Sequence, residues 1–213
     1  EMLFHGYKEI SESERYSLRA VCSNIVEDVS NKIIDSIVKE DINIGSITRL
    51  EKPYVIPMIN EIICFADYNK DKTIQLVIVG SSVSGEIEKL IYNRAKNIPN
   101  LKVLITGYMY PVPRSLFKII DIFIGVSGSA QATAAEGALT LTLDVRDSKP
   151  IGLLGYDTNN NIFRDSQNTE SISTVLQRVL IEQPVTTKHN GVKKYDFREV
   201  FQTHLEFIYS GAD

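Results

Sequence analysis

The stretch Ile74-Gln75-Leu76-Val77-Ile78-Val79-Gly80 decides the fold class of this chain. Its last four residues before the glycine are all apolar, and such an uninterrupted run is typical of a strand that is covered on both faces. Gly80 ends the strand, and apolar residues at helical spacing begin soon afterwards, over 85–96. A strand that leads at once into a helix is the first part of a β–α–β unit, which predicts a parallel sheet.

The same alternation continues on both sides of this stretch. Because strand and helix alternate, we expect right-handed crossovers and an α/β fold with a doubly wound, Rossmann-like parallel sheet. We predict further strands at 42–47, 101–106, 122–126 and 139–145, and helices at 53–67, 113–120, 129–139 and 171–181.

The two ends of the chain differ from this central part. Near the start, residues 20–22 indicate a brief strand, and the apolar residues between Ile25 and Ile37 predict a helix. Residues 183–195 form a polar connector with Pro and Gly, and a closing amphipathic helix is expected over 196–209. We therefore predict three parts with the boundaries 1–40, 41–182 and 183–213.

The composition excludes several classes of protein. The chain has 213 residues with 23 Lys and Arg against 27 Asp and Glu, a net charge of −4, and 43% hydrophobic residues. These values are typical of a globular protein and argue against a dedicated nucleic-acid binder, which needs a positive stripe. No apolar run approaches the ~18 residues of a membrane-spanning helix. Cys22 and Cys64 have no partner at metal-ligand spacing, so we expect buried thiols in a reducing compartment.

Candidate ligand contacts follow the predicted strands. Ligands of open α/β sheets bind beyond the carboxyl ends of the strands. The loop after the first strand carries two cations, Arg49 and Lys52. The loops after the next strands begin with Gly80, with Gly107-Tyr108 and with Ser127-Gly128-Ser129. Glycines, hydroxyls and cations at one edge suit a phosphate-bearing ligand, because backbone N–H groups and a helix N-terminus bind anions.

Two nucleotide-binding motifs are excluded, and three assignments stay open. Gly80 and Gly85 have the spacing of a P-loop, but Glu86 and Ile87 stand where Lys and Ser or Thr are required, and no G-x-G-x-x-G follows a strand. The Gly80 loop is either a ligand loop or a plain turn. Asp144 either has a functional role or caps a turn, and Glu136 either faces a ligand or is solvated.

Read together, five segments resemble the carboxyl-terminal half of GT-B fold glycosyltransferases of the "group 1" family, family 4. Residues 43–52 are similar to a strand of the family that ends in Gly-Arg-Leu followed by Lys. Residues 116–127 are similar to a helix and strand of the form "ADIFV.PS". The series keeps the order of the family and covers most of the chain. The segments are 43–52, 76–80, 98–107, 116–127 and 195–209.

The resemblance implies that this domain binds a nucleotide-diphosphate sugar donor. It implies a metal-independent transfer in which Arg49 and Lys52 are catalytic, because they neutralise the leaving diphosphate. A saccharide or lipid-linked acceptor would bind the amino-terminal domain, of which residues 1–40 would be a remnant, so this fragment alone would be inactive. Contacts to the donor are expected from Gly80, Gly107, Tyr108, Ser127, Gly128, Ser129 and Glu136.

The chain departs from the family pattern at two places. Lys52 follows Arg49 more closely than is usual, and the family's Glu-x7-Glu pair is broken. If Gly137 matches the family glycine, Ala132 replaces the ribose-binding Glu; if Glu136 is that Glu, Gly128 replaces the first. The main hypothesis is a cytoplasmic glycosyltransferase of envelope or capsule polysaccharide synthesis, with peripheral membrane association of the full-length protein. The alternatives are a nucleotide-sugar epimerase of similar fold and a non-catalytic nucleotide-binding relative.

Overall fold

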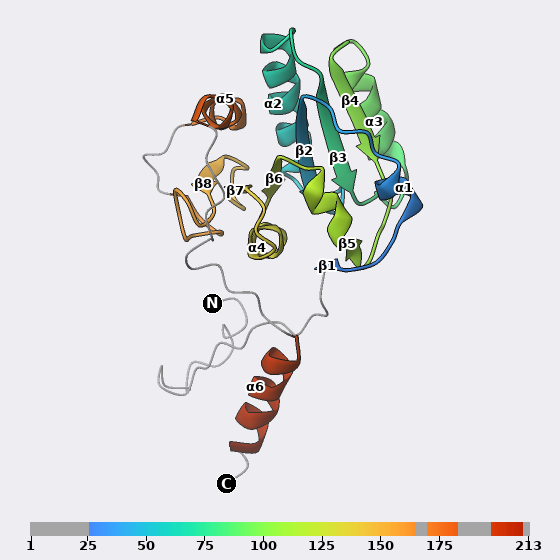
Figure 1. Cartoon of the computed structure of the whole chain (residues 1–213). Helices are drawn as coiled ribbons and strands as arrows, with labels where there is room; N and C mark the ends of the chain where they lie inside the picture. The colour runs from blue at the N-terminus through green and yellow to red at the C-terminus, as the bar shows by residue number, and fades with distance from the viewer. Residues whose placement is uncertain (1–25, 165–169, 183–196, 211–213) are drawn as a thin grey trace. The chain divides into compact units, whose positions relative to one another are not determined.

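A computed structural model of the chain describes residues 26–164, 170–182 and 197–210. The chain forms two compact units. The first unit spans residues 25–194 and contains the sheet, which is seen in the upper part of Figure 1. The described part of the second unit is the helix α6 (Phe197–Ser210). The predicted connector at 183–195 and strand at 20–22 lie outside the described residues.

The first unit is built on a six-stranded sheet in the order β4-β3-β2-β6-β7-β8. Because β3 lies on one side of β2 and β6 lies on the other, the order reverses between β2 and β6, as in a doubly wound fold. The predicted α/β, Rossmann-like fold is confirmed. The five parallel strands are β2 (Ile42–Ile47), β3 (Ile74–Val79), β4 (Leu101–Ile105), β6 (Ile122–Gly125) and β7 (Thr140–Leu143).

The last strand corrects the expectation of a purely parallel sheet. Strand β8 (Pro150–Leu153) was not predicted, and it pairs antiparallel with β7. The predicted strand over 139–145 is shorter, because the chain leaves the sheet at Asp144 and turns back at Lys149, whose carbonyl accepts the Asp144 N–H. A short return without a crossover helix can only produce an antiparallel neighbour.

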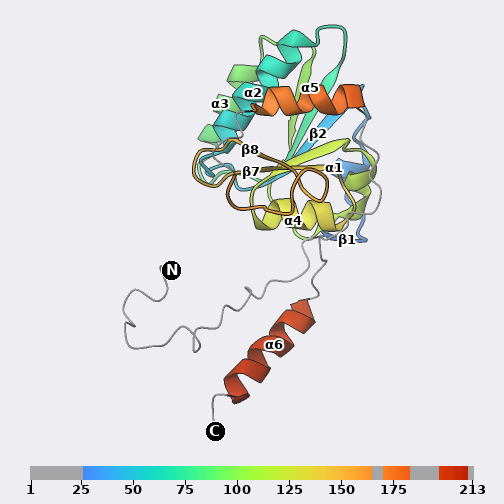
Figure 2. The same ribbon diagram turned by 90° about the vertical axis from the view of Figure 1, so that its left-hand side faces the viewer.

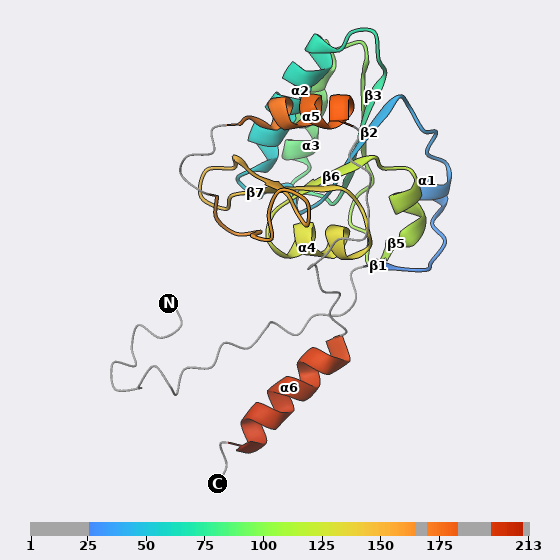
Figure 3. The same cartoon turned by 60° about the vertical axis from the view of Figure 1, so that its left-hand side comes forward.

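Helices cover both faces of the sheet. Helix α2 (Val55–Tyr68) packs against α3 (Glu86–Ala95) and against α5 (Ile172–Glu182), which lies across it in Figure 2. Figure 3 shows α4 (Gly128–Ala135) on the opposite side of β6 and β7 from α5. Strand β3 explains the continuous apolar run, because Leu76 and Ile78 contact the α2 side while Val77 and Val79 contact the other side.

The segment before the sheet differs from its predicted helix. Strand β1 (Val26–Glu27) pairs parallel with β5 (Val112–Pro113), and α1 (Lys32–Asp35) has four residues. The apolar spacing misled the prediction, because Ile34 is fully buried whereas Val29 and Ile33 are exposed. This segment packs with the short helix η3 (Arg114–Lys118) and belongs to the compact unit of residues 25–194.

Helix α2 shows how single residues are placed by the helical period. Cys64, which was expected to be buried, is exposed, because its neighbours Ile62 and Phe65 occupy the core-facing side. The Asn100 side-chain amide donates to the carbonyl oxygens of Ala66, Asn69 and Lys72 at distances of 2.9–3.0 Å. This bonding satisfies carbonyls at the end of α2 and explains the polar residue just before β4.

Among the described residues, no helix is long and apolar enough to cross a membrane.

Candidate functional site

A cavity of about 650 Å³ lies at the carboxyl ends of β2 and β3. The segment that follows β4 closes its third side. The position agrees with the rule that ligands of doubly wound sheets bind beyond the carboxyl ends of the strands. The cavity is lined by residues 47–49, 51, 52, 79–83, 108–110 and 112.

Gly80 allows the loops after β2 and β3 to meet. A Cβ atom at this residue would lie 1.7 Å from the carbonyl oxygen of Thr48, so no other residue fits without movement of the backbone. The two loops are also joined by hydrogen bonds from Thr48 N to the Val79 oxygen, 3.0 Å, and from Leu50 N to the Ser81 oxygen, 3.3 Å. Gly80 therefore shapes the cavity through its backbone.

Gly107 and the tyrosines after it form the third side. Gly107 makes an isolated antiparallel bridge with Gly80, which fixes the segment after β4 against the loop after β3. The left-handed φ of Gly107, 78°, favours glycine at this turn. Beyond it, Tyr108 and Tyr110 line the cavity and are 78% and 45% exposed. Exposed aromatic rings beside a polar loop offer a surface on which a flat ligand group can stack.

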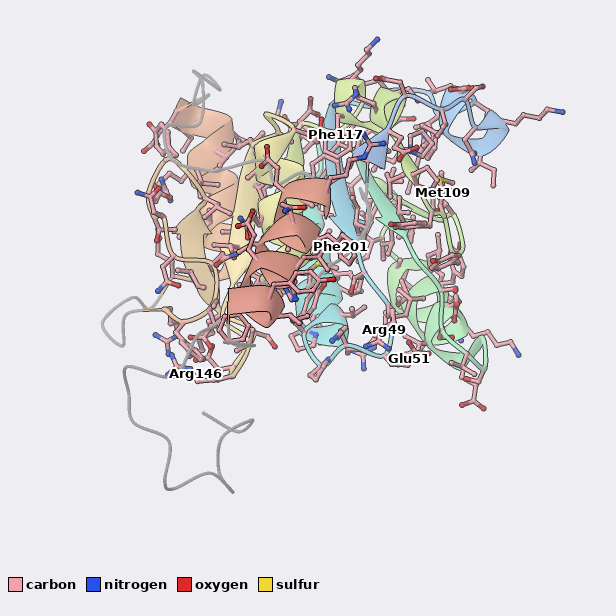
Figure 4. The ribbon with its side chains drawn as sticks, turned by 90° about the horizontal axis from the view of Figure 1, so that it is seen from below. Arg49, Glu51, Met109, Phe117, Arg146 and Phe201 are labelled. Atoms are coloured by element: carbon pink, nitrogen blue, oxygen red, sulfur yellow. The ribbon has the colours of Figure 1, made fainter. Side chains whose placement is uncertain are left out.

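Arg49 and Lys52 both line the cavity with exposed side chains. Within the described residues, neither forms an ion pair, and Arg49 does not pair with its near neighbour Glu51. Figure 4 shows Arg49 and Glu51 close together in the loop after β2; Met109, which also lines the cavity, is labelled apart from them. Two cations without carboxylate partners at the mouth of a cavity are suited to an anionic ligand.

The loop after β3 binds carboxylates of the protein itself. Val83 N donates to Glu51 Oε1 at 2.6 Å, and Ser82 N donates to Glu88 Oε1 at 2.7 Å. The Ser82 hydroxyl donates to the second oxygen of Glu88. Although desolvation raises the pKa of Glu88, these Ser82 hydrogen bonds lower it below the ordinary value. Glu51 and Glu88 were not among the predicted site residues, because only the glycine spacing of this loop indicated that it could bind an anion.

The loop between β6 and α4 lies at the same edge but does not line the cavity. Ser127 adopts φ 50° and ψ −117°, which is unfavourable for a residue with a side chain. Asn161 holds it there, because Ser127 N donates to the Asn161 carbonyl and the Asn161 amide donates to the Ser127 carbonyl, both at 3.1 Å. Gly128 is exposed, and a Cβ on it would meet no atom within 4 Å.

Tyr54 connects this second loop to the cavity. Its side chain is buried between β2 and the start of α4, and burial raises the pKa of the phenol. The nearby hydroxyl groups of Thr48 and Ser129 act in the opposite direction and partly offset this rise in pKa. The Ser129 hydroxyl also donates to the Val126 carbonyl at 3.0 Å. Sequence reasoning missed Tyr54, because a tyrosine beside an apolar helix is usually part of the core.

Glu136 lies apart from the other predicted contacts. It follows the carboxyl end of α4, whereas Ser127, Gly128 and Ser129 lie at its amino end. Its side chain is almost fully buried and forms an ion pair with Arg114.

Of the predicted site residues, the structure brings Arg49, Lys52, Gly80 and Tyr108 together in one cavity, and Gly107 forms a bridge with Gly80. The residues of α4 itself, Gly128–Ala135, include no carboxylate.

Asp144 is bonded entirely to its own neighbourhood. Its buried carboxylate accepts hydrogen bonds from the Arg146 backbone and guanidinium and from Arg164 N, at distances of 2.6–3.0 Å. The Arg146 hydrogen bond is the main cause that holds the pKa of Asp144 well below its usual range, against the effect of desolvation. Of the two roles open for Asp144, the geometry favours the turn-capping one.

The described residues contain no group of three or more His, Cys, Asp or Glu that could hold a metal ion.

Comparison with known proteins gives similarity in structure only. No family model matches the chain, and no curated protein matches it in sequence. The pneumococcal O-GlcNAc transferase GtfA, solved with UDP and GlcNAc, is similar with a TM-score of 0.53 at 11% identity over 91% of this chain. HepE of Anabaena, solved with UDP and glucose, has a TM-score of 0.54 at 15% identity over 79% of this chain.

A UDP-GlcNAc 2-epimerase of Methanocaldococcus jannaschii, solved with UDP-GlcNAc and UDP, has a TM-score of 0.49 at 17% identity. It is matched over 82% of this chain and 47% of its own. The present chain covers 38% of GtfA and 48% of HepE, so it spans less than half of either protein. At these identities the similarity to GtfA and HepE shows the fold, a mainly parallel α/β domain of the Rossmann-like type.

Proposed function

We propose that this chain is the donor-binding half of a GT-B fold glycosyltransferase and that its cavity binds a nucleotide-diphosphate sugar. The observation that carries the proposal is the pair Arg49 and Lys52, which line the cavity without a carboxylate partner among the described residues. Support comes from the position of the cavity beyond the parallel strands and from similarity to proteins solved with UDP and a sugar.

In this proposal the cations stabilise the leaving group. When the bond between sugar and diphosphate breaks, negative charge develops on the diphosphate oxygens. The planar guanidinium of Arg49 binds two of these oxygens at once, and Lys52 adds a second charge. Groups fixed where charge develops stabilise the transition state more than the ground state, which is the requirement for catalysis. A metal ion is not needed for this role.

The exposed tyrosines are assigned to the nucleoside. Tyr108 follows Gly107 on the third side of the cavity and has an exposed ring, whereas the two cations belong to the loop after β2. The loop with Ser127, Gly128 and Ser129 is assigned to the sugar side, where the small residues allow the backbone to approach a ligand. Glu136 is left out of the proposed site because of its ion pair with Arg114.

The acceptor and the biological role follow from the resemblance. We propose that a saccharide or lipid-linked acceptor binds a second domain, in cytoplasmic synthesis of an envelope or capsule polysaccharide, with the full-length protein at the membrane surface. Because one wall of a cleft cannot align two reactants, the chain by itself is expected to bind nucleotide weakly and transfer no sugar. Alignment of reactants contributes up to ~7–11 kcal/mol in favourable systems.

A non-catalytic nucleotide-binding protein is the second candidate. It is favoured by one observation, the absence of a carboxylate on α4 between Gly128 and Ala135. An epimerase is less well supported, because the side chains that line the cavity include one carboxylate, Glu51, and no histidine.

A thermal-shift scan of nucleotides and nucleotide sugars tests the binding function. A ligand that binds only the folded chain raises the melting temperature in proportion to the logarithm of its concentration above Kd. We expect a shift with UDP, GDP or their sugars, and no shift with any of them would contradict the proposal. Product analysis with the full-length protein then separates a transferase from a binding protein. Rapid sugar transfer by residues 1–213 alone would contradict the assignment as half of an enzyme.

A further inference from the structure

The loop after β3 has the glycine spacing of a phosphate-binding loop, but three of its backbone N–H groups are already bonded within the protein. Val83 N donates to Glu51 Oε1, Ser82 N donates to Glu88 Oε1, and Gly85 N donates to the Ser82 hydroxyl at 2.9 Å. In a phosphate-binding loop, such N–H groups point at the ligand. In this chain two carboxylates of the protein take the place of the phosphate oxygens.

The two carboxylates differ in where they come from. Glu88 belongs to α3 and bonds to the loop that precedes its own helix. Glu51 reaches across from the loop after β2, from a position between Arg49 and Lys52 in the sequence, and it lines the cavity with them. It is the single acidic residue among the lining residues. The charged groups of the cavity are therefore two cations and one fixed anion.

We propose that Glu51 is a specificity-determining residue that limits the negative charge of the ligand. Held by the Val83 amide beside Arg49 and Lys52, its carboxylate reduces the positive potential that a phosphate experiences. It also occupies an N–H group that a further phosphate would otherwise bind. This inference rests on the proposed binding of a nucleoside diphosphate, and it explains why two cations are accompanied by a carboxylate that pairs with neither.

A series of ligands with increasing charge tests the inference. Uridine, UMP, UDP and UTP share one nucleoside, and the guanosine series replaces them if GDP is the better ligand in the thermal scan. The variant Glu51→Gln removes the charge but keeps a side-chain oxygen for the Val83 N–H, so the loop stays bonded. The control Asp71→Asn removes one exposed carboxylate from the turn between α2 and β3. This turn lies at the amino end of β3, whereas the cavity lies at its carboxyl end.

Isothermal titration at low salt should show that Glu51→Gln leaves uridine binding unchanged and tightens the binding of phosphorylated ligands. The gain should grow by roughly two- to threefold with each added charge, the size expected for exposed charges several ångströms apart in water. It should decrease as salt is added, because salt screens exposed charges. Asp71→Asn should show no such trend.

The outcomes separate this inference from the proposed function. If the parent chain binds UDP but Glu51→Gln changes all four affinities by the same factor, or not at all, the inference is wrong and the binding function stands. Weaker UDP binding by Glu51→Gln would also contradict it, because the carboxylate would then contact the ligand favourably. If neither protein binds any of the four ligands, the proposed function fails and the inference fails with it.

Discussion

The backbone of Gly80 lies against the carbonyl oxygen of Thr48, so closely that a Cβ atom would be 1.7 Å from that oxygen. The contact joins the loops after β2 and β3, and both residues line the candidate site. A residue that forces these loops apart should change the cavity as well as the fold, because the same loops carry Arg49 and the bonded amides of the loop after β3.

Gly80→Ala should therefore lower both stability and nucleotide binding. We expect a loss of about 1–3 kcal/mol in the free energy of unfolding, the usual cost of an atom without space. Urea unfolding measures this loss, and titration with UDP measures binding. Gly128→Ala is the matched control for the stability measurement, since a Cβ there would meet no atom within 4 Å. Equal stability of the two variants would contradict the close contact.

Asp144→Asn should destabilise the chain at neutral pH. The carboxylate is fully buried and accepts hydrogen bonds from Arg146 and Arg164, so we expect a loss of about 1.5–3 kcal/mol, the range for bonds to charged groups. The exposed Asp71→Asn serves as the control in urea unfolding. A loss no larger than that of Asp71→Asn would show that the buried carboxylate does not stabilise the turn.

The contribution of Asp144 should depend on pH. Its pKa is lowered in the folded chain, so the unfolded carboxylate binds a proton first as the pH falls. The stabilisation is therefore complete above about pH 3.9, the ordinary pKa of Asp, and is lost progressively below it. Unfolding at neutral pH and at about pH 3 should show the difference between parent and Asp144→Asn becoming smaller in acid. A constant difference would contradict this account.

Gly128→Val tests the second loop. Gly128 is exposed at the start of α4, and a side chain there would project into open space rather than into the core. We expect the melting temperature to stay similar while nucleotide or nucleotide-sugar binding weakens, because the added branches block close approach to the backbone. Titration with UDP and with UDP-sugars measures the effect. Normal binding of both ligands would remove the loop from the site.

The order of the central strands and helices could be predicted from the sequence because short apolar strands alternate with segments of helical spacing. The clearest strand signal is Leu76–Val79, a continuous apolar run that is buried on both faces. The convergence of Arg49, Gly80 and Tyr108 followed from one topological rule. The elements that were not predicted depend on particular contacts, which hydrophobic periodicity does not encode. The short elements β1 and β5 form by pairing with each other, and β8 depends on a turn closed by Asp144 and Lys149.

The partners of the acidic residues also could not be predicted from the sequence. Glu51, Glu88 and Glu136 look alike as exposed carboxylates in a linear sequence. Their partners are a loop amide at Val83, another loop amide at Ser82 and the guanidinium of Arg114. Each pairing is set by tertiary geometry, and no periodic pattern or spacing encodes it.

The proposed site depends above all on Arg49, which we expect to bind the diphosphate of a nucleotide ligand. The most direct test is titration of the parent chain, Arg49→Ala and Arg49→Lys with UDP and GDP. Because the Arg49 side chain is exposed and forms no ion pair within the described residues, its loss should leave the melting temperature nearly unchanged. We expect Arg49→Ala to weaken binding by about 1.5–3 kcal/mol, the range for a charge-assisted hydrogen bond. Arg49→Lys should restore only part of this, since the two-oxygen geometry is lost. Unchanged affinity of Arg49→Ala for the nucleotide that binds the parent chain would make Arg49 an ordinary surface residue and contradict the site assignment.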